Sequence, residues 1–380
     1  MITYANRLKS VQEYYFSAKL KQVRQLALQG KPIINMGIGS PDLLPDKTVL
    51  KSLKNSLLES QAHQYQSYQG IPEFRFAIAN FYKEKYGVVL NSETEVLPLM
   101  GSKEGIMHIS LSFLNKEDKV LIPNPGYPTY SSVSKLLGAK PVFYSLSESN
   151  NWQPDFEQLE TFNLSQVKLM WVNYPHMPTG AKALTETFQR LVSFGKKHNI
   201  LIVNDNPYSF ILNNKPLSIL QVKGAKEIAL ELNSLSKTFN MAGWRVGMLL
   251  GSKEHLNQVF KVKTQMDSGM FYGIQKAAAK ALELDKSWYD QQNKIYKLRQ
   301  QLVFELAQKL HCSYNKNSLG MFVWAKLTNG LDSEKMTNYL LYDKHIFVAP
   351  GTVFGNQGQG YIRFSLCVPE AKIKQALTRF

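Results

Sequence analysis

Short apolar segments alternate with helix-like segments along most of this chain, and this alternation restricts its possible folds more than any other feature. The apolar segments cover residues 119–122, 169–172, 200–203, 228–230 and 246–250. Uninterrupted apolar runs of this length are typical of strands that are buried on both faces. Helix-like stretches, such as the one from Thr185 to Lys197, lie between them. The pattern predicts an α/β fold with a mostly parallel sheet.

Polar and turn-forming residues follow four of these apolar runs. They lie in residues 123–127, 173–180, 204–208 and 233–247. The carboxyl ends of parallel strands meet at one edge of a sheet, and ligands bind at that edge in open α/β sheets. The sequence therefore predicts one ligand site that is built from four distant segments.

The length and the C-terminal pattern indicate two domains. The chain has 380 residues, 44% of them hydrophobic and 19% charged, which suits a large domain with a smaller companion. A long helical stretch at 282–310 is followed by short strands near 320–327, 346–348 and 361–366 and by a terminal helix at 369–380. We expect an N-terminal segment at 1–40 that packs with the small domain, a large domain at 41–282 and a small α+β domain at 283–380.

Charge, hydropathy and cysteine content exclude several classes of protein. The formal net charge of +16 comes from Lys and Arg spread along the chain, which indicates a solvated surface that attracts small anions, without a nucleic-acid partner. No apolar run approaches membrane-spanning length, and residues 1–10 lack the apolar core of a secretory signal. Cys312 and Cys367 form no CxxC pair, so we expect neither disulfides nor a metal site, and a cytoplasmic protein.

An amine, two hydroxyls and a guanidinium lie close together in residues 233–247. Lys237 is flanked by Ser234 and Ser236, and Arg245 follows eight residues later. A lysine that attacks a carbonyl needs a lowered pKa and a fixed position. Hydroxyls and a bidentate arginine suit a phosphate monoester. The combination predicts a lysine that holds a phosphorylated aldehyde such as pyridoxal phosphate, and a surface Ser/Lys loop is the alternative.

With Asp205, Tyr208 and Arg363 also in view, the chain resembles the fold-type I pyridoxal-phosphate enzymes. More narrowly, it resembles the class I/II aminotransferases of the aspartate-aminotransferase-like group. The resemblance extends from about Ile34 to Ser365, with the motifs in order. It implies a three-layer large domain with a mostly parallel sheet and a smaller α+β domain.

The resemblance implies a role for each residue around the cofactor ring. Lys237, Asp205 and Tyr208 would be the catalytic residues, and all three would contact pyridoxal 5'-phosphate. Asp205 would pair with the pyridinium nitrogen and keep it protonated. Tyr208 would hydrogen-bond the ring 3-oxygen, and Tyr127 would stack on the ring face.

A second set of residues would hold the phosphate of the cofactor. Free N–H groups at a helix N-terminus bind anions, and a helix is expected to open at residues 101–105. The implied phosphate contacts are Gly101, Ser102, Lys103, Ser234, Ser236 and Arg245. In relatives, the tyrosine that matches Tyr65 reaches the phosphate of the neighbouring subunit. We therefore expect a homodimer with active sites at the interface.

The substrate side of the site departs from the family pattern at one position. Arg363 matches the arginine that grips the α-carboxylate, and Gly39 would let the backbone approach the same group. The family usually has N-P-T-G where this chain has M-P-T-G, so Met177 replaces a hydrogen-bond donor. Losing one hydrogen bond to a charged group costs roughly 1.5–3 kcal/mol, and His176 or Asn173 would have to compensate.

The resulting functional prediction is transamination between an L-amino acid and a 2-oxo acid, with Lys237 moving the α-proton. The alternatives are a carbon–sulfur β-lyase on the same fold and a non-enzymatic cofactor-binding module. The largely apolar segment 266–272 favours a bulky or apolar substrate side chain, whereas the net charge favours an acidic one. Tyr14, Tyr15 and Phe16 are expected to contribute to the same pocket.

Overall fold

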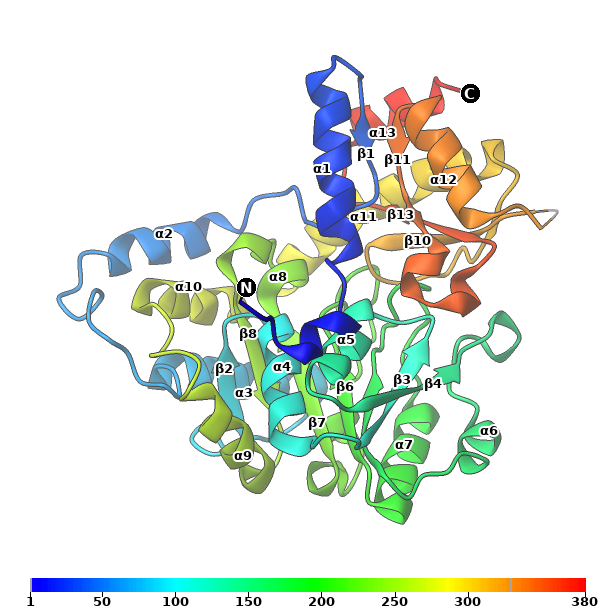
Figure 1. Cartoon of the computed structure of the whole chain (residues 1–380). Coiled ribbons are helices and arrows are strands. Elements are labelled where there is room, and N and C mark those ends of the chain that lie inside the picture. Colours follow the sequence, from blue (N-terminus) through cyan, green and yellow to red (C-terminus); the bar gives the residue numbers. More distant parts are fainter. Residues whose placement is uncertain (1, 329) are drawn as a thin grey trace.

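The computed structural model describes residues 2–328 and 330–380, and a large sheet lies at its centre (Figure 1). Within these residues, the sheet has seven strands in the order β2-β8-β7-β6-β5-β3-β4. The strands are β2 (Val96–Leu99), β3 (Lys119–Asn124), β4 (Lys140–Ser145), β5 (Val167–Val172), β6 (Leu201–Asp205), β7 (Ala229–Ser234) and β8 (Gly247–Leu250). Only β8 runs antiparallel to its neighbours in this sheet. The predicted α/β fold with a mostly parallel sheet is confirmed.

Helices cover both faces of this sheet, so the large unit has three layers. One face packs against α4 (Ser102–Phe113), α5 (Pro128–Leu136) and α9 (Lys253–Lys263), and the other packs against α3 (Pro72–Tyr86) and α7 (Thr185–His198). In β3, the side chains of Val120 and Ile122 join the core under α4 and α5, whereas Leu121 joins the opposite core. Both faces are buried, which explains the uninterrupted apolar runs.

Both strands that the apolar runs did not predict, β2 and β4, are edges of the sheet. Proline at position 98 is compatible with an edge strand, where fewer N–H groups are needed for pairing. In β4, Phe143 is exposed and Tyr144 is buried, so the strand has no continuous apolar run. The apolar signal of β4 is weak because several of its side chains are open to solvent, whereas all four residues of β2 are buried.

The C-terminal elements form a smaller α+β unit. Its four-stranded sheet has the order β12-β13-β10-β9 within the described residues. The strands are β9 (Ser313–Tyr314), β10 (Phe322–Lys326), β12 (Ala349–Pro350) and β13 (Tyr361–Ser365), and the helices are α11 (Lys286–Lys309), α12 (Ser333–Tyr342) and α13 (Glu370–Leu377). The expected long helix, short strands and terminal helix are all present.

The N-terminal segment packs against this smaller unit. Strand β1 (Ile34–Asn35) pairs in parallel with β11 (Ile346–Phe347), and α1 (Tyr15–Leu28) stands beside the C-terminal elements (Figure 1). The remaining α-helices of the described chain are α2 (Lys47–Ser56), α6 (Phe156–Glu160), α8 (Leu235–Thr238) and α10 (Tyr272–Leu282). No helix within residues 2–328 or 330–380 has both the length and the apolar composition to cross a bilayer.

A buried arginine joins segments that lie far apart in the sequence. Arg299 on α11 donates from both terminal nitrogens to Asp42, at 2.6 and 3.0 Å, and from Nε to Glu370 at 2.8 Å. Its Nη1 also donates to the carbonyl of Leu366 at 3.1 Å. The Arg299 side chain is 2% exposed, whereas both carboxylates are partly open to water. Each nitrogen of the Arg299 guanidinium donates a hydrogen bond. Removing this side chain would leave the two carboxylates without their cation.

We expect the Arg299→Met substitution to lower the free energy of unfolding by about 3 kcal/mol, because removing one partner of a buried ion pair strands the others. Lys294→Met on the same helix is the control, since Lys294 is exposed. Chemical denaturation measures both variants. Equal stabilities for the two would contradict this structural role of Arg299.

Candidate active site

A cavity of about 480 Å³ lies at the carboxyl ends of the parallel strands, and most of the predicted site residues line it. Its lining includes Gly39, Ser102, Lys103, Tyr127, Met177, Asp205, Tyr208, Ser234, Ser236, Lys237, Arg245 and Arg363. A volume of this size is in the usual range for a small-molecule site. Of the predicted residues, Gly101 lies directly behind the lining and Tyr65 lies outside the cavity.

Lys237 is held at the start of a short helix that follows β7. The hydroxyl of Ser234 accepts a hydrogen bond from the backbone N–H of Ser236 at 3.0 Å, which caps α8. The Lys237 ammonium donates to the carbonyl of Gly39 at 2.6 Å. Burial lowers the pKa of Lys237, and the charges of Arg363 and Arg245 act in the same direction. A lowered pKa favours the neutral amine, which is the nucleophilic form.

Asp205, the last residue of β6, presents one free carboxylate oxygen. Its Oδ2 accepts from the Tyr130 hydroxyl at 2.8 Å, whereas its buried Oδ1 has no hydrogen-bond partner in the described part of the chain. Burial raises the pKa of Asp205 to about 7, and the hydrogen bond from Tyr130 and the charge of Lys237 oppose that rise. An unpaired buried acceptor of this kind fits the protonated ring nitrogen of pyridoxal phosphate.

The residues on either side of Asp205 are fixed on the opposite face of β6. The side chains of Asn204 and Asn206 each donate to Glu231 at 3.3 Å. Glu231 is fully buried and also accepts from the Ser218 hydroxyl at 2.9 Å. This network holds the end of β6, so the Asp205 side chain is directed to the cavity face by strand alternation.

Tyr130 is a site residue that the sequence analysis missed. It lies on α5, is fully buried, and stacks on Trp171 with ring centroids 4.7 Å apart and planes 6° apart. Its hydroxyl is therefore fixed against Asp205. The available signal was spacing: Tyr130 follows Tyr127 by three residues at the start of a helix, so both rings face the same side. The two rings meet edge to face at 5.5 Å.

The end of the cavity near α4 is positively charged. Gly101 has φ of +87°, and a Cβ there would lie 2.3 Å from Nη2 of Arg245, so only glycine lets the guanidinium come this close. Lys103 lies nearby, and burial and the charge of Arg245 lower its pKa. A helix N-terminus with two cations beside it suits a phosphate dianion.

Arg363 is buried at the centre of β13. It donates from Nη2 to the carbonyl of Gly37 at 2.7 Å, and its Nη1 lies 3.4 Å from the sulfur of Met177. Its Nε has no partner among the residues that the structure describes. Burial lowers the pKa of Arg363 to about 10, so the group stays charged at neutral pH. A buried guanidinium without a carboxylate partner suits an anionic substrate group.

Aromatic rings surround this guanidinium. Its central carbon lies 4.0 Å from the ring centre of Phe322, 4.6 Å from that of Phe354 and 5.4 Å from that of Phe16. Phe322 also packs where a Cβ of Gly39 would be, at 2.3 Å. Of the aromatic residues expected from the N-terminal segment, Tyr14 and Phe16 line the cavity and Tyr15 does not.

The two polar neighbours of Met177 do not present an amide where the usual asparagine would. Asn173 lines the cavity, but its amide donates to the Asp205 carbonyl and accepts from the Met177 N–H. His176 lies outside the lining; its Nδ1 pairs with the Thr179 hydroxyl at 2.8 Å, and its buried Nε2 has no partner in the described residues. Burial lowers the pKa of His176 to about 3, so the ring is neutral. Neither side chain takes over the missing contact in this chain.

Two predicted segments lie together away from the cavity. Tyr65 is 91% exposed, and residues 266–272 do not line the cavity of this chain, contrary to the expectation for that segment. Gly269 packs against the backbone of Gln66, and the rings of His63 and Phe271 are 6.4 Å apart. These segments therefore form one outer surface.

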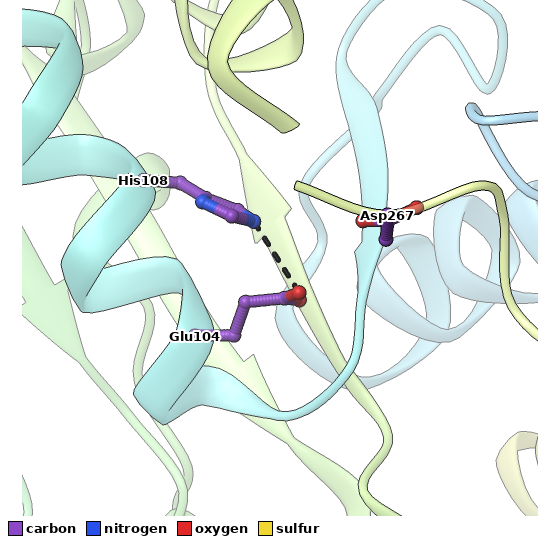
Figure 2. A group of neighbouring side chains, drawn as sticks. All are labelled: Glu104, His108 and Asp267. Carbon is purple, nitrogen blue, oxygen red and sulfur yellow. Dashed lines mark ion pairs between the residues drawn. The ribbon is translucent and has the colours of Figure 1, made fainter. Parts of the chain in front are cut away.

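A second polar cluster lies beneath α4, formed by Glu104, His108 and Asp267 (Figure 2). The His108 Nε2 is 3.4 Å from Glu104, beyond a good hydrogen bond. Asp267 is already occupied, because Lys263 lies 2.8 Å from both of its oxygens and both side chains are buried. A metal ion would have to displace this ammonium, so the cluster is a charge network that joins α4 to the loop after α9.

Comparison with known proteins gives consistent results over the full chain. The pattern of the family "Aminotransferase class I and II" matches residues 31–380. An LL-diaminopimelate aminotransferase from Aquifex aeolicus is 38% identical over 381 aligned residues, covering 100% of this chain and 98% of the relative. The substrate-bound BacF structure from Bacillus subtilis is 34% identical with a TM-score of 0.96, covering 100% and 97%. An aromatic aminotransferase from Pyrococcus horikoshii is 27% identical with a TM-score of 0.87, covering 94% and 97%.

The raised pKa of Asp205 predicts a pH effect on the stability of the cofactor-free protein. From pH 5 up to about pH 7 the folded state holds a proton that the unfolded chain has lost, so this residue makes stability fall by roughly 2–3 kcal/mol as the pH rises from 5 to 8. Asp205→Asn should remove that contribution. Denaturation of both proteins at pH 5 and pH 8 measures the difference, and parallel pH dependence in the two would contradict the shift.

Proposed function

The chain belongs to the class I and II aminotransferases, pyridoxal-phosphate enzymes that move an amino group between an amino acid and a 2-oxo acid, and we propose that the side chains around Lys237 perform this reaction. The residue roles below are supported by contacts within the cavity. The single observation that carries them is that half-buried Lys237 and the buried side chains of Asp205 and Arg363 line one cavity.

Asp205 and Tyr208 would hold the cofactor ring. When bound, pyridoxal phosphate supplies an electron sink for negative charge at the substrate α-carbon. The free Oδ1 of Asp205 would keep the ring nitrogen protonated, and Tyr130 would keep that carboxylate ionised and oriented. Tyr208 would donate to the ring 3-oxygen, and Tyr127 would cover the ring face.

The phosphate of the cofactor would be held at the positive end of the cavity. The implied contacts are the start of α4 at Gly101, Ser102 and Lys103, the hydroxyls of Ser234 and Ser236, and the guanidinium of Arg245. Ser234 and Ser236 are buried, whereas Arg245 is exposed in the isolated chain. An exposed phosphate ligand is consistent with a second subunit covering it.

Lys237 would move the proton. Its amine would take the α-proton from the substrate and return a proton to the aldehyde carbon of the cofactor. Burial lowers the pKa of this amine, which makes the neutral base more available near neutral pH. Arg363 would grip the substrate α-carboxylate and, with the backbone at Gly39, present the α-carbon to Lys237. The 2.6 Å contact between Lys237 and the Gly39 carbonyl supports this proximity.

The relatives support transamination over the β-lyase alternative, and an enzyme over a binding module. The names of these relatives also suggest two different amino donors for this chain. The Aquifex relative is named for LL-diaminopimelate, and the Pyrococcus structure is named for aromatic substrates. Shared family membership does not choose between these donors, because specificity depends on the cavity wall.

We further propose a cytoplasmic homodimer with the domain division at 1–40, 41–282 and 283–380. The outer surface formed by residues 63–68 and 266–271 exposes Tyr65 by 91%, Met266 by 58% and Phe271 by 40%. Exposed apolar side chains gathered on one surface are typical of an interface. Tyr65 would then reach the phosphate end of the partner's cavity.

We expect Lys237→Ala to abolish amino transfer, because no other amine would occupy its place. Borohydride reduction followed by peptide mass spectrometry should find the cofactor on residue 237 in the wild type and not in the variant. Lys253→Ala, an exposed lysine on α9, should retain both activity and labelling. Amino transfer at the wild-type rate by Lys237→Ala would refute the proposed role.

Subunit mixing tests the shared active site. Tyr65→Ala should weaken cofactor retention about tenfold or more through loss of a phosphate contact. Mixing it with Lys237→Ala should restore about one quarter of wild-type activity, since half of the dimers would be hybrids with one intact site. Tyr4→Ala, at an exposed tyrosine, is the control. An active monomer in sedimentation, or no recovery on mixing, would contradict the dimer.

A further inference from the structure

We propose that this cavity selects an amino donor with an uncharged apolar side chain, aromatic or long aliphatic, in a subsite formed by Phe16, Leu20, Ile38, Met177 and Phe354. All five line the cavity. The inference rests on the proposed function, because it assumes that Arg363 holds the α-carboxylate. The proposed subsite would disfavour a donor that carries a second charged end, such as the diaminopimelate for which the Aquifex relative is named.

Each charged group that lines the cavity either has a role in the proposed reaction or lies at the phosphate end. None of them remains to pair with a charge at the far end of the donor's side chain. Asp205 faces the ring nitrogen, Lys237 performs the reaction, and Arg363 takes the α-carboxylate. Arg245 and Lys103 lie together at the phosphate end, with the Lys103 ammonium 4.5 Å from the ring centre of Tyr14. Within the described lining, Asp205 is the only carboxylate, so a distal ammonium would find no free anion.

The wall beside Arg363 is mainly apolar, and the Ser17 hydroxyl that also lines it is bonded to Glu13 at 2.7 Å. Helix α1 contributes Phe16 and Leu20, and the rings of Phe16 and Phe354 are 6.3 Å apart. Both rings also flank the guanidinium of Arg363. A donor gripped by Arg363 would therefore extend its side chain along aromatic and aliphatic surface.

Met177 extends this apolar wall to the carboxylate-binding position. Its side chain is 6% exposed, and its sulfur lies 3.4 Å from Nη1 of Arg363. A thioether is a weak acceptor and an adaptable apolar surface, whereas the usual asparagine would present an amide here. Neither neighbour restores that amide, because Asn173 is bonded to the Asp205 carbonyl and the Met177 N–H and His176 lies outside the cavity lining.

The surface proposed to reach the partner's cavity adds no unpaired carboxylate or ammonium. Residues 63–69 read HQYQSYQ, in which the ionisable groups are the tyrosine hydroxyls and the imidazole of His63, whose Nε2 lies 3.1 Å from the Leu57 carbonyl. In 266–272 the charged residue is Asp267, which is neutralised by Lys263 at 2.8 Å. A dimer built through these segments would keep the donor subsite uncharged.

Desolvation decides between the two kinds of donor. A distal ammonium or carboxylate that enters the subsite would lose water without gaining a partner. A ring or an alkyl chain would gain about 25 cal/mol for each Å² of apolar surface buried. The same wall therefore favours one donor and rejects the other.

A matched pair of ligands tests the subsite without catalysis. Heptanoate and heptanedioate have the same chain length, and they differ by one terminal carboxylate. Calorimetry on the cofactor-loaded enzyme should give at least about tenfold tighter binding for heptanoate, because the second carboxylate must be desolvated. Equal or tighter binding of heptanedioate would overturn the proposal.

The amino-donating half reaction separates this inference from the proposed function. With each donor in turn, stopped-flow absorbance follows conversion of the cofactor to its amine form. Phenylalanine, methionine and leucine should react with kcat/KM about 100-fold above LL-diaminopimelate, aspartate and glutamate. Faster reaction of the charged donors would overturn the subsite but leave transamination standing. Failure of every donor would refute transamination itself.

A charge placed in the wall should weaken the preference for apolar donors. Leu20→Arg introduces a guanidinium into the subsite, and it should narrow the ratio of phenylalanine to glutamate turnover by about tenfold or more. Leu28→Arg makes the same change on the same helix at a position that is 86% exposed, and it should leave the ratio unchanged. An unchanged ratio in folded Leu20→Arg would place the donor side chain elsewhere and overturn the assignment.

Discussion

The burial of Asp205 at the end of a parallel strand is the constraint on which the site depends. A carboxylate in this position has its pKa raised by desolvation, and one hydrogen bond from Tyr130 opposes that rise. The surrounding strand end is fixed by Glu231 on the opposite face and by Asn173, the residue that directly follows β5. The free oxygen of Asp205 is therefore presented to the cavity with little freedom to move.

Arg363 closes the cavity from the smaller unit. It lies on β13, contacts the N-terminal segment through the Gly37 carbonyl, and reaches Met177 in the loop after β5. One guanidinium thus joins three parts of the chain. Arg299 likewise joins distant parts of the chain, because it contacts Asp42, Glu370 and the carbonyl of Leu366, which follows β13 directly.

The substitution at Met177 changes the surroundings of Arg363 in a definite direction. The position is filled by a thioether, and no neighbouring amide or imidazole replaces the lost donor in the described residues. The aromatic rings on the other sides of Arg363 continue the same apolar character. Met177 therefore has two effects on the cavity wall: it removes a polar contact, and it adds apolar surface to the proposed donor subsite.

Much of this protein could be predicted from sequence alone. Apolar runs locate the central strands because those strands are buried on both faces, and the residues after them mark the edge where the cavity lies. Lys237, its serines and Arg245 are close in sequence, so their chemistry is visible without a structure. Strand β4 was missed because only part of it is buried, whereas β2 is buried throughout but spans four residues that include Pro98.

Tertiary structure alone decided which side chains meet across long sequence separations. Tyr130 reaches Asp205 only because α5 packs over the sheet, and Phe16, Phe354 and Met177 surround Arg363 only because the N-terminal segment folds onto the smaller unit. Segment 266–272 lies away from its own chain's cavity for the same reason. Sequence patterns record burial and local spacing, whereas contacts between distant segments depend on how the layers pack.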